Sequence, residues 1–324
     1  LEYTTKAPFA ALGLEFGGLS LDGSVRWDFS EAKGRTFGDG PVTTRDINGN
    51  GAINRAETLV SVLPTTGAAL VDYDTDYLSY SVGANYLVSD SFSIFGRYSR
   101  GGRANADRIL FNANNVDPAT GELRNSDVAV DFVKQAEIGV KYRAGGLSFY
   151  ATAFDARTEE ENFEATTQTV FSRAYKARGV ELEGSYRMGP FSLSGGATYT
   201  DAEIDRDNIS PANVGNTPRR QADWIYQATA AYDSELFGLG VNAVGTSDSY
   251  AQDSNQLVLP GFTAVNAFVN LRPADGITLS LNANNVFDVE GFTEAEEGAI
   301  PANGIVRARS INGRTLSASV RFDF

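Results

Sequence analysis

Apolar and polar residues alternate along most of the chain. Between positions 19 and 30, every odd residue is Leu, Gly, Val, Trp or Phe, and every even residue is Ser, Asp or Arg. The last ten residues alternate in the same way, with polar residues on either side of Leu316, Val320 and Phe322 in the odd positions. Successive side chains of a β-strand point to opposite faces, so each such segment predicts a strand with one apolar and one polar face.

Thirteen segments with this alternation divide the chain. They lie near residues 7–17, 18–29, 73–88, 91–101, 130–143, 146–157, 168–188, 190–201, 221–234, 237–249, 260–272, 276–286 and 312–324. The connections between them are short and long in strict turn, the long ones falling at 30–72, 102–129, 158–167, 202–220, 250–259 and 287–311. This order predicts antiparallel strands with tight turns at one end and long loops at the other.

The length of these segments separates two kinds of all-β fold. Strands of a soluble β-sandwich average about 5–6 residues, whereas a strand that crosses a membrane needs about 9–11. The segments here are of the longer kind, and no repeat of fixed length indicates a propeller. The pattern therefore predicts a transmembrane antiparallel β-barrel, with short periplasmic turns and long external loops.

The alternation also assigns individual side chains to a face. The expected lipid-facing residues include Leu193, Leu279 and Val320, and the expected lumen-facing ones include Ser194, Ser280 and Ser319. Tyr150 and Phe154 share the predicted lumen face of their strand. Trp27 and Trp224 fall near the outer ends of their strands, which favours an aromatic girdle at the membrane interface over a platform for substrate.

The composition excludes several functions. The chain has 27 basic and 41 acidic residues, a net charge of −14, and neither His nor Cys. Without them there is no Ser-His-Asp triad, no Cys-His pair, no His-ligated metal and no disulfide, so we expect that the protein is not an enzyme. The acidic balance also argues against a nucleic-acid partner, which would require a basic surface. No run approaches 18 apolar residues, so no transmembrane helix is predicted.

Four stretches resemble the TonB-dependent receptors of the outer membrane. Residues 178–184 (RGVELEG) resemble a strand in the middle of the family's barrel, and residues 95–101 (FGRYSRG) resemble one of its hairpins. Residues 281–288 (LNANNVFD) and 313–324 (GRTLSASVRFDF) resemble its last two strands. The order and spacing of the four stretches carry the resemblance, which covers about residues 91–324.

This resemblance implies a place for the chain within a larger protein. Family members have a 22-stranded barrel with an N-terminal plug, so residues 1–324 would be about thirteen C-terminal strands. The plug domain and the early strands would not be in this chain. Thirteen is also an odd number, whereas bacterial single-chain barrels have an even number of strands. We therefore expect missing strands on the N-terminal side, and an external loop at residues 30–72.

The resemblance further implies function and partners. It indicates an outer-membrane receptor for active transport of a scarce, bulky nutrient, such as a ferric siderophore, cobalamin or an oligosaccharide. The partners would be this small-molecule substrate, TonB acting through the absent plug segment, and the surrounding outer-membrane lipid and lipopolysaccharide. Two alternatives stay open: a passive porin, which needs neither plug nor TonB, and a calcium-dependent surface scaffold. An outer-membrane hydrolase is disfavoured, because such enzymes generally use His.

A calcium-loop motif lies within the long loop at 30–72. Residues 46–57 match the EF-hand pattern D-x-[DN]-x-[DN]-G-x₅-E. The predicted Ca²⁺ ligands are the side chains of Asp46, Asn48, Asn50, Asn54 and Glu57 and the backbone carbonyl of Ala52. Gly51 stands where the loop turns sharply. Because only two ligands are carboxylates, and Arg45 and Arg55 are close, we expect modest affinity; the alternative is an Asn/Gly-rich turn.

Two acidic segments fall in predicted external loops. Residues 158–164 and 290–297 are rich in Glu. They indicate either a solvated loop surface or a means of recruiting cations or a cationic substrate.

Overall fold

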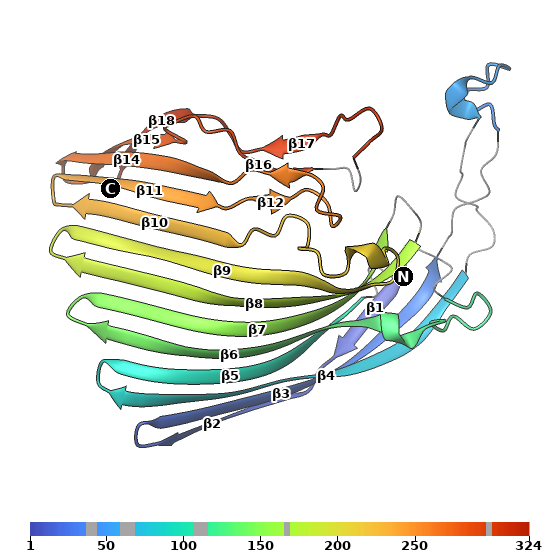
Figure 1. Ribbon diagram of the computed structural model, residues 1–324, viewed down its shortest axis with the longest axis horizontal. Helices are drawn as coiled ribbons and strands as arrows, with labels where there is room; N and C mark the ends of the chain where they lie inside the picture. The colour runs from blue at the N-terminus through green and yellow to red at the C-terminus, as the bar shows by residue number, and fades with distance from the viewer. Residues whose placement is uncertain (37–43, 59–68, 106–115, 165–168, 296–299, 324) are drawn as a thin grey trace.

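The computed structural model describes residues 1–36, 44–58, 69–105, 116–164, 169–295 and 300–323. In this part of the chain, one large antiparallel sheet curves like a section of a cylinder wall (Figure 1). The strands of this sheet are β1 (Glu2–Lys6), β2 (Phe9–Phe16), β3 (Leu19–Thr36), β4 (Ala69–Ser89), β5 (Phe92–Ala104), β6 (Val130–Ala144), β7 (Leu147–Glu164), β8 (Thr169–Met188), β9 (Phe191–Asp207), β10 (Trp224–Asp233), β11 (Phe237–Thr246), β14 (Phe262–Ala274), β15 (Ile277–Asn284) and β18 (Thr315–Phe322). Neighbours in the sheet follow the chain order.

The first two strands share one position in this order. Both pair with β3, β1 along residues 29–33 and β2 along residues 19–26. The interruption between them contains Pro8, which has no N–H to continue the ladder, although its carbonyl accepts from the N–H of Trp27 over 3.0 Å. The described sheet thus has thirteen positions, one for each predicted segment. The prediction of an all-β antiparallel fold is confirmed.

The two faces of the sheet differ as the alternation predicts. Leu279 is paired with Val320, and Ser280 with Ser319, so apolar and polar residues point to opposite sides. Leu193 and Val320 are 55% and 56% exposed, on a face that a soluble protein would bury. We call this apolar side the outward face and the polar side the lumen face. The outward face has the character of a surface in contact with hydrocarbon.

Several strands are longer than the sequence predicts at the end with the long connections, which we call the outer end. β3 continues to Thr36 and β4 begins at Ala69, so the loop predicted at 30–72 is shorter at both ends. Residues 37–43 and 59–68 of that loop lie outside the described residues. The loop boundaries in the prediction were therefore wrong by several residues on each side.

One of the two acidic segments is placed differently from the prediction. Residues 158–164 belong to β7 and not to a loop, whereas β16 (Phe292–Ala295) lies in the connection between β15 and β18, where the segment 290–297 was predicted. Backbone pairing continues beyond the membrane, where water accepts polar side chains on both faces. The alternation therefore stops before the hydrogen-bonded ladder does, and sequence periodicity misses the extension.

Smaller elements lie at the outer end (Figure 1). They are the hairpin of β12 (Ser249–Tyr250) and β13 (Val258–Leu259), the hairpin of β16 and β17 (Ala308–Ser310), and the 3₁₀ helices η1 (Arg55–Glu57), η3 (Ser126–Ala129) and η4 (Pro211–Asn213). Within the described ranges, no helix has the length and apolar character to cross a membrane.

The sheet is open at two edges. One edge is formed by β1 and β2 and the other by β18, and the two lie on opposite sides of the wall (Figure 1). No pairing joins them in the described residues.

Candidate functional site

A short hairpin, residues 116–123 with a bridge between Val116 and Leu123, packs on the outer end of β4 on the lumen side. Val116 of this hairpin packs with Val71 and Tyr73 in a small buried core. The carbonyl of Gly121 accepts a hydrogen bond from the N–H of Asp72 over 2.9 Å. A Cβ at Gly121 would lie 2.6 Å from that nitrogen, so only glycine permits this contact. The hairpin is therefore fixed to the wall.

An ion-pair centre connects two strands to a more distant hairpin. Arg173 on β8 binds Asp207 at the end of β9 through Nε (2.9 Å) and Asp253 between β12 and β13 through Nη1 (2.9 Å). The three side chains are 14%, 0% and 11% exposed, so this is a buried arrangement. Removing one member of such a group leaves an uncompensated buried charge.

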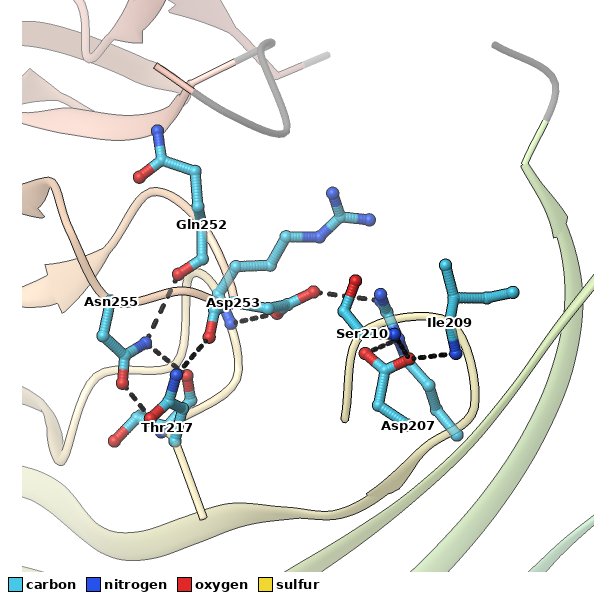
Figure 2. Close-up of polar contacts among 10 residues, drawn as sticks. Asp207, Ile209, Ser210, Thr217, Gln252, Asp253 and Asn255 are labelled. Carbon is cyan, nitrogen blue, oxygen red and sulfur yellow. Dashed lines mark hydrogen bonds and ion pairs between the residues drawn. The ribbon is translucent and has the colours of Figure 1, made fainter. Parts of the chain in front are cut away.

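Asp207 also begins the connection that leads to η4. The N–H groups of Ile209 and Ser210 donate to its Oδ1 over 3.0 and 2.9 Å (Figure 2). Burial acts to raise the pKa of Asp207, but the Ser210 N–H and the Arg173 guanidinium stabilise the carboxylate, and the net pKa is lowered. Asp207 is therefore ionised at neutral pH and holds both the cation and the turn.

The connection 208–223 is joined to the β12–β13 hairpin. The side chain of Asn216 donates to the carbonyl of Asp253, and the N–H of Arg219 donates to Asp253 Oδ1, both over 2.9 Å. Thr217 and Asn255 exchange two hydrogen bonds: the Thr217 N–H donates to Asn255 Oδ1 (3.0 Å), and Asn255 Nδ2 donates to the Thr217 carbonyl (2.7 Å; Figure 2). The two segments thus form one unit.

The β16–β17 hairpin is attached to the same unit. Arg220 lies 3.2 Å from Glu294, and Arg309 lies 3.4 Å from the same carboxylate. Arg220 Nη2 also donates to the carbonyl of Ala295 over 3.2 Å, and Ala295 is buried against Ala251. Three connections therefore form one outer-loop network, which we define as Arg173, Asp207, Asp253, Asn255, Arg220 and Glu294.

Gln252 lies next to Asp253 in this network. It is 1% exposed, and neither atom of its side-chain amide has a hydrogen-bond partner among the described residues. A buried amide without partners is unfavourable, so this position has the capacity to bind a polar group.

The calcium-loop motif is folded around its own side chains. Asp46 Oδ1 accepts from the N–H of Gly49 (2.8 Å) and Oδ2 from that of Gly51 (2.7 Å). Asn48 Oδ1 and Asn50 Oδ1 accept from the backbone two residues further on, over 3.0 and 2.8 Å. Gly51 has φ +79°, which suits the sharp turn expected at this position. The Asp46, Asn48 and Asn50 oxygens thus organise the first half of the loop.

Glu57 closes the loop from its other end. Its carboxylate accepts from the N–H of Ile47 (3.1 Å) through one oxygen and from that of Asn54 (3.0 Å) through the other. The Asn54 N–H bond is the main cause of a lowered Glu57 pKa, and the residue is 3% exposed. No group of three His, Cys, Asp or Glu side chains gathers anywhere in the described residues, and this loop contributes only Asp46 and Glu57. Any cation here would depend on the Asn and carbonyl oxygens.

A shallow cavity of about 670 Å³ lies on the lumen face of β7 to β11. Tyr150, Glu181, Glu183 and Gln227 line it together with several hydroxyl side chains. Tyr150 and Phe154 are in register with the lumen-facing positions of β8, as predicted. The lining offers carboxylates, hydroxyls and an amide, which suit a polar ligand or a polar protein surface and contain no nucleophile–base pair.

Sequence reasoning missed the outer-loop network for a physical reason. Arg173 lies 34 residues from Asp207 and 80 from Asp253, and only strand register brings the three together. The one local signal is the segment 207–211 (DNISP), in which Asp, Asn, Ser and Pro favour a turn.

Comparison with protein families gives one match. The model of the TonB dependent receptor-like β-barrel matches residues 1–286. A search of curated protein sequences finds no match. The resemblance that four short stretches indicated is thus confirmed over most of the chain.

Solved structures give the same fold. The siderophore receptor PiuA of Acinetobacter baumannii is 19% identical with TM-score 0.72, and 99% of this chain aligns with 43% of that chain. The ferric yersiniabactin uptake receptor FyuA of Yersinia pestis is 16% identical with TM-score 0.75, and 99% of this chain aligns with 46% of that chain. The ferric-catecholate import receptor Fiu of E. coli K12 is 17% identical with TM-score 0.71, and 99% of this chain aligns with 45% of that chain. The chain therefore spans less than half the length of these receptors, which are transport proteins and not enzymes.

Proposed function

The chain belongs to the TonB-dependent receptor β-barrel family of the bacterial outer membrane, and on this premise we propose that it forms part of the wall of an active-transport receptor. The proposed cargo is a ferric siderophore, with cobalamin and an oligosaccharide as the other classes of scarce, bulky nutrient. Energy would come from TonB, acting through a plug segment outside this chain. Outer-membrane lipid and lipopolysaccharide would surround the wall.

One observation carries this proposal beyond family membership. The wall has a polar lumen face, and three of its outer connections are tied by buried ion pairs into a single network. A network of this kind holds the loops in place at the mouth of the lumen, where a receptor must first bind a solute. The siderophore class is favoured because the similar solved receptors are described as siderophore or ferric-complex receptors.

Equilibrium binding to the complete purified receptor tests the cargo. Intrinsic fluorescence would be titrated with ferric catecholate and hydroxamate siderophores, cobalamin and a set of oligosaccharides. We expect saturable binding of a ferric siderophore, and weaker or no binding of the iron-free form. Saturable binding of cobalamin or an oligosaccharide, and not of a siderophore, would make that compound the substrate class. The absence of saturable binding by all of these compounds would favour the porin alternative.

We also propose that loop 46–57 binds Ca²⁺ at the outer surface. The six predicted ligands, Asp46, Asn48, Asn50, Ala52, Asn54 and Glu57, stand at EF-hand spacing. Two features support the proposal: the first three side-chain oxygens order one half of the loop, and the buried Glu57 carboxylate reaches back to the other half. Asp46 Oδ2 and Glu57 Oε2 each accept one N–H and keep a second lone pair for a cation, whereas Asp46 Oδ1 and Glu57 Oε1 each accept two N–H groups. With two carboxylates, the affinity should fall at about 10⁻⁴–10⁻³ M, as in extracellular modules.

Limited proteolysis of the complete receptor tests the calcium loop. Calcium at ~10 mM, above the expected affinity range, should slow cleavage between Gly34 and Asp72 in the wild type. Glu57→Gln should remove this protection, because it halves the ligand charge. The matched control is Glu122→Gln, which replaces an exposed carboxylate in another connection. This variant should keep the protection by calcium. Equal protection of the wild type and Glu57→Gln would show that the loop is only a turn-rich insertion.

A further inference from the structure

The lumen face of the sheet is divided into a charged and an uncharged half. On β9, β10, β11, β14, β15 and β18, the lumen-facing positions between the two ends of each strand hold only uncharged residues in the described sheet. We call this half the neutral strip and represent it by Ser194, Thr229, Asn242, Asn266, Ser280 and Ser319. The first four are successive register partners across β9 to β14, and Ser280 is the partner of Ser319.

The other half of the lumen face carries charges in the middle of the wall. Arg97 on β5 is the register partner of Glu137 on β6, and its guanidinium also lies 3.0 Å from the carboxylate of Asp22 on β3. Glu181 and Glu183 on β8 face the lumen, and neither forms an ion pair with another described residue. A charged side chain holds solute groups of opposite sign, most strongly where water is partly excluded. This half is therefore suited to retaining a charged group and not to releasing it.

Side chains of the neutral strip are hydrogen-bonded to one another. Asn242 Nδ2 donates to Thr229 Oγ1 over 2.9 Å, and Asn266 Nδ2 donates to Asn242 Oδ1 over 3.2 Å. Asn266 Oδ1 in turn accepts from the N–H of Asn285 over 2.9 Å. These amides are held against the wall and partly satisfied. A solute that passes over them exchanges single neutral hydrogen bonds, which are weak in net terms because water competes for the same groups.

The cations at the inner ends of these strands are paired. Arg272 near the end of β14 lies 2.9 Å from the carboxylate of Asp233 at the end of β10, and Arg321 near the end of β18 lies 2.7 Å from that of Asp323. In each pair the carboxylate neutralises the guanidinium. The neutral strip therefore reaches the inner end of the wall without an unpaired cation that would retain an anionic solute.

The outer end of the neutral strip meets the outer-loop network. The connection 208–223 joins β9 to β10, the β12–β13 hairpin joins β11 to β14, and the β16–β17 hairpin joins β15 to β18. The three connections that the network holds together are thus those that join strands of the neutral strip (Figure 1). A solute bound at this network would meet the uncharged half of the wall first.

We propose that the cargo moves along the neutral strip, from the outer-loop network to the inner ends of β9 to β18. Passage requires contacts that are favourable enough for entry, yet weak and numerous enough for release. A wall of hydroxyl and amide groups supplies such contacts, whereas the carboxylates of β8 would retain or repel a charged chelate. This inference rests on the proposed transport function and adds to it the side of the wall that the solute follows.

Bulky substitutions in the complete receptor test this path. Ser194→Trp and Ser280→Trp narrow the space over the neutral strip at β9 and β15. Thr152→Trp is the matched control on the lumen face of β7, opposite Glu181. Each variant is checked for heat-modifiable assembly and for binding of the ferric siderophore, catecholate or hydroxamate, that the equilibrium titration selects. The readout is the initial rate of uptake of that siderophore, labelled with radioactive iron.

Photochemical cross-linking gives a second measurement that needs no variant. A diazirine derivative of the same ferric siderophore is irradiated during uptake by cells with the wild-type receptor. Mass spectrometry of the digested receptor then identifies the peptides to which the siderophore is attached. Cross-links should fall on β9 to β18.

Both strip variants should assemble and bind the siderophore like the wild type, but take it up about tenfold more slowly, an added barrier of about 1.4 kcal/mol. Uptake by Thr152→Trp should stay within about twofold of the wild type. Unchanged uptake by the strip variants, an equal loss in the control, or cross-links confined to β3 to β8 would overturn the path. Failure of both strip variants to assemble would also overturn it, because protein would then fill this space. No uptake by the wild type would overturn the transport proposal itself, and this inference falls with it.

Discussion

At the scale of single residues, Arg173 is the residue on which the outer loops depend most. It is the cation shared by two nearly buried carboxylates, Asp207 and Asp253. Arg173→Gln should favour local opening of the connection 208–223 by about 3 kcal/mol, because it leaves two buried charges without a partner. The rate of proteolysis in that connection measures the effect. Arg206→Gln, at the adjacent exposed position, should change the opening free energy by no more than about 0.5 kcal/mol.

The lowered pKa of Asp207 gives the same network a pH dependence. A carboxyl group whose pKa is lower in the folded state stabilises that state. This stabilisation is complete at a pH above the pKa of the unfolded state, which is about 3.9. The stabilisation is lost as the pH falls through the lower pKa that Asp207 has in the folded state. Proteolysis by an acid-stable protease should therefore accelerate below about pH 4 in wild type. In Asp207→Asn, opening should be faster already at pH 6 and should change less on acidification; an identical pH profile would contradict the assignment.

At the scale of elements, the alternation of a strand determines what each position tolerates. Leu182 is an outward residue in the middle of the apolar part of β8. Thr198 is a lumen residue on β9 and is paired with Glu181 of β8. An Arg on the lipid side near the midplane costs about 2–4 kcal/mol. Leu182→Arg should therefore reduce the amount of assembled, heat-modifiable receptor, whereas Thr198→Arg should be tolerated beside Glu181. Equal impairment would show that the two faces are wrongly assigned.

The elements also show how far a sequence can be interpreted by itself. All thirteen wall positions were predicted, because a strand with one face in lipid and one in water must alternate. The outer extensions of β3, β7 and β9 were missed, since strands in water need no alternation. The register that assembles the outer-loop network is a long-range property. The EF-hand-like motif could be found in the sequence because its residues are local, and the bound metal stays a prediction.

The placement of the connections relative to the membrane gives a further prediction. Asn213, in the connection after β9, should face the outside, and Gly189, in the turn between β8 and β9, should face the periplasm. A Cys at position 213 should react with an impermeant thiol reagent on intact cells, and one at 189 should not. The chain has no Cys of its own, so the labelling is specific. The reverse pattern would invert the topology.

At the scale of the whole molecule, the described sheet is an open section of a barrel wall and not a closed barrel. Its edges at β1–β2 and at β18 carry backbone groups without strand partners in the described sheet. Hydrocarbon does not tolerate such edges, so both require pairing within the membrane. A closed barrel around the polar lumen face would meet that requirement. The proposed transport would accordingly be a property of the complete receptor, and cells that contain it are the place to test it.

The complete receptor, as proposed, takes up a nutrient with energy supplied through TonB. The most direct test is the initial rate of uptake of ⁵⁵Fe-labelled siderophore by cells with and without the receptor, each in a TonB-positive and a TonB-negative strain. We predict accumulation only when receptor and TonB are both present, and its loss on addition of a protonophore. Uptake that needs the receptor but proceeds equally without TonB would contradict the claim and identify a passive pore.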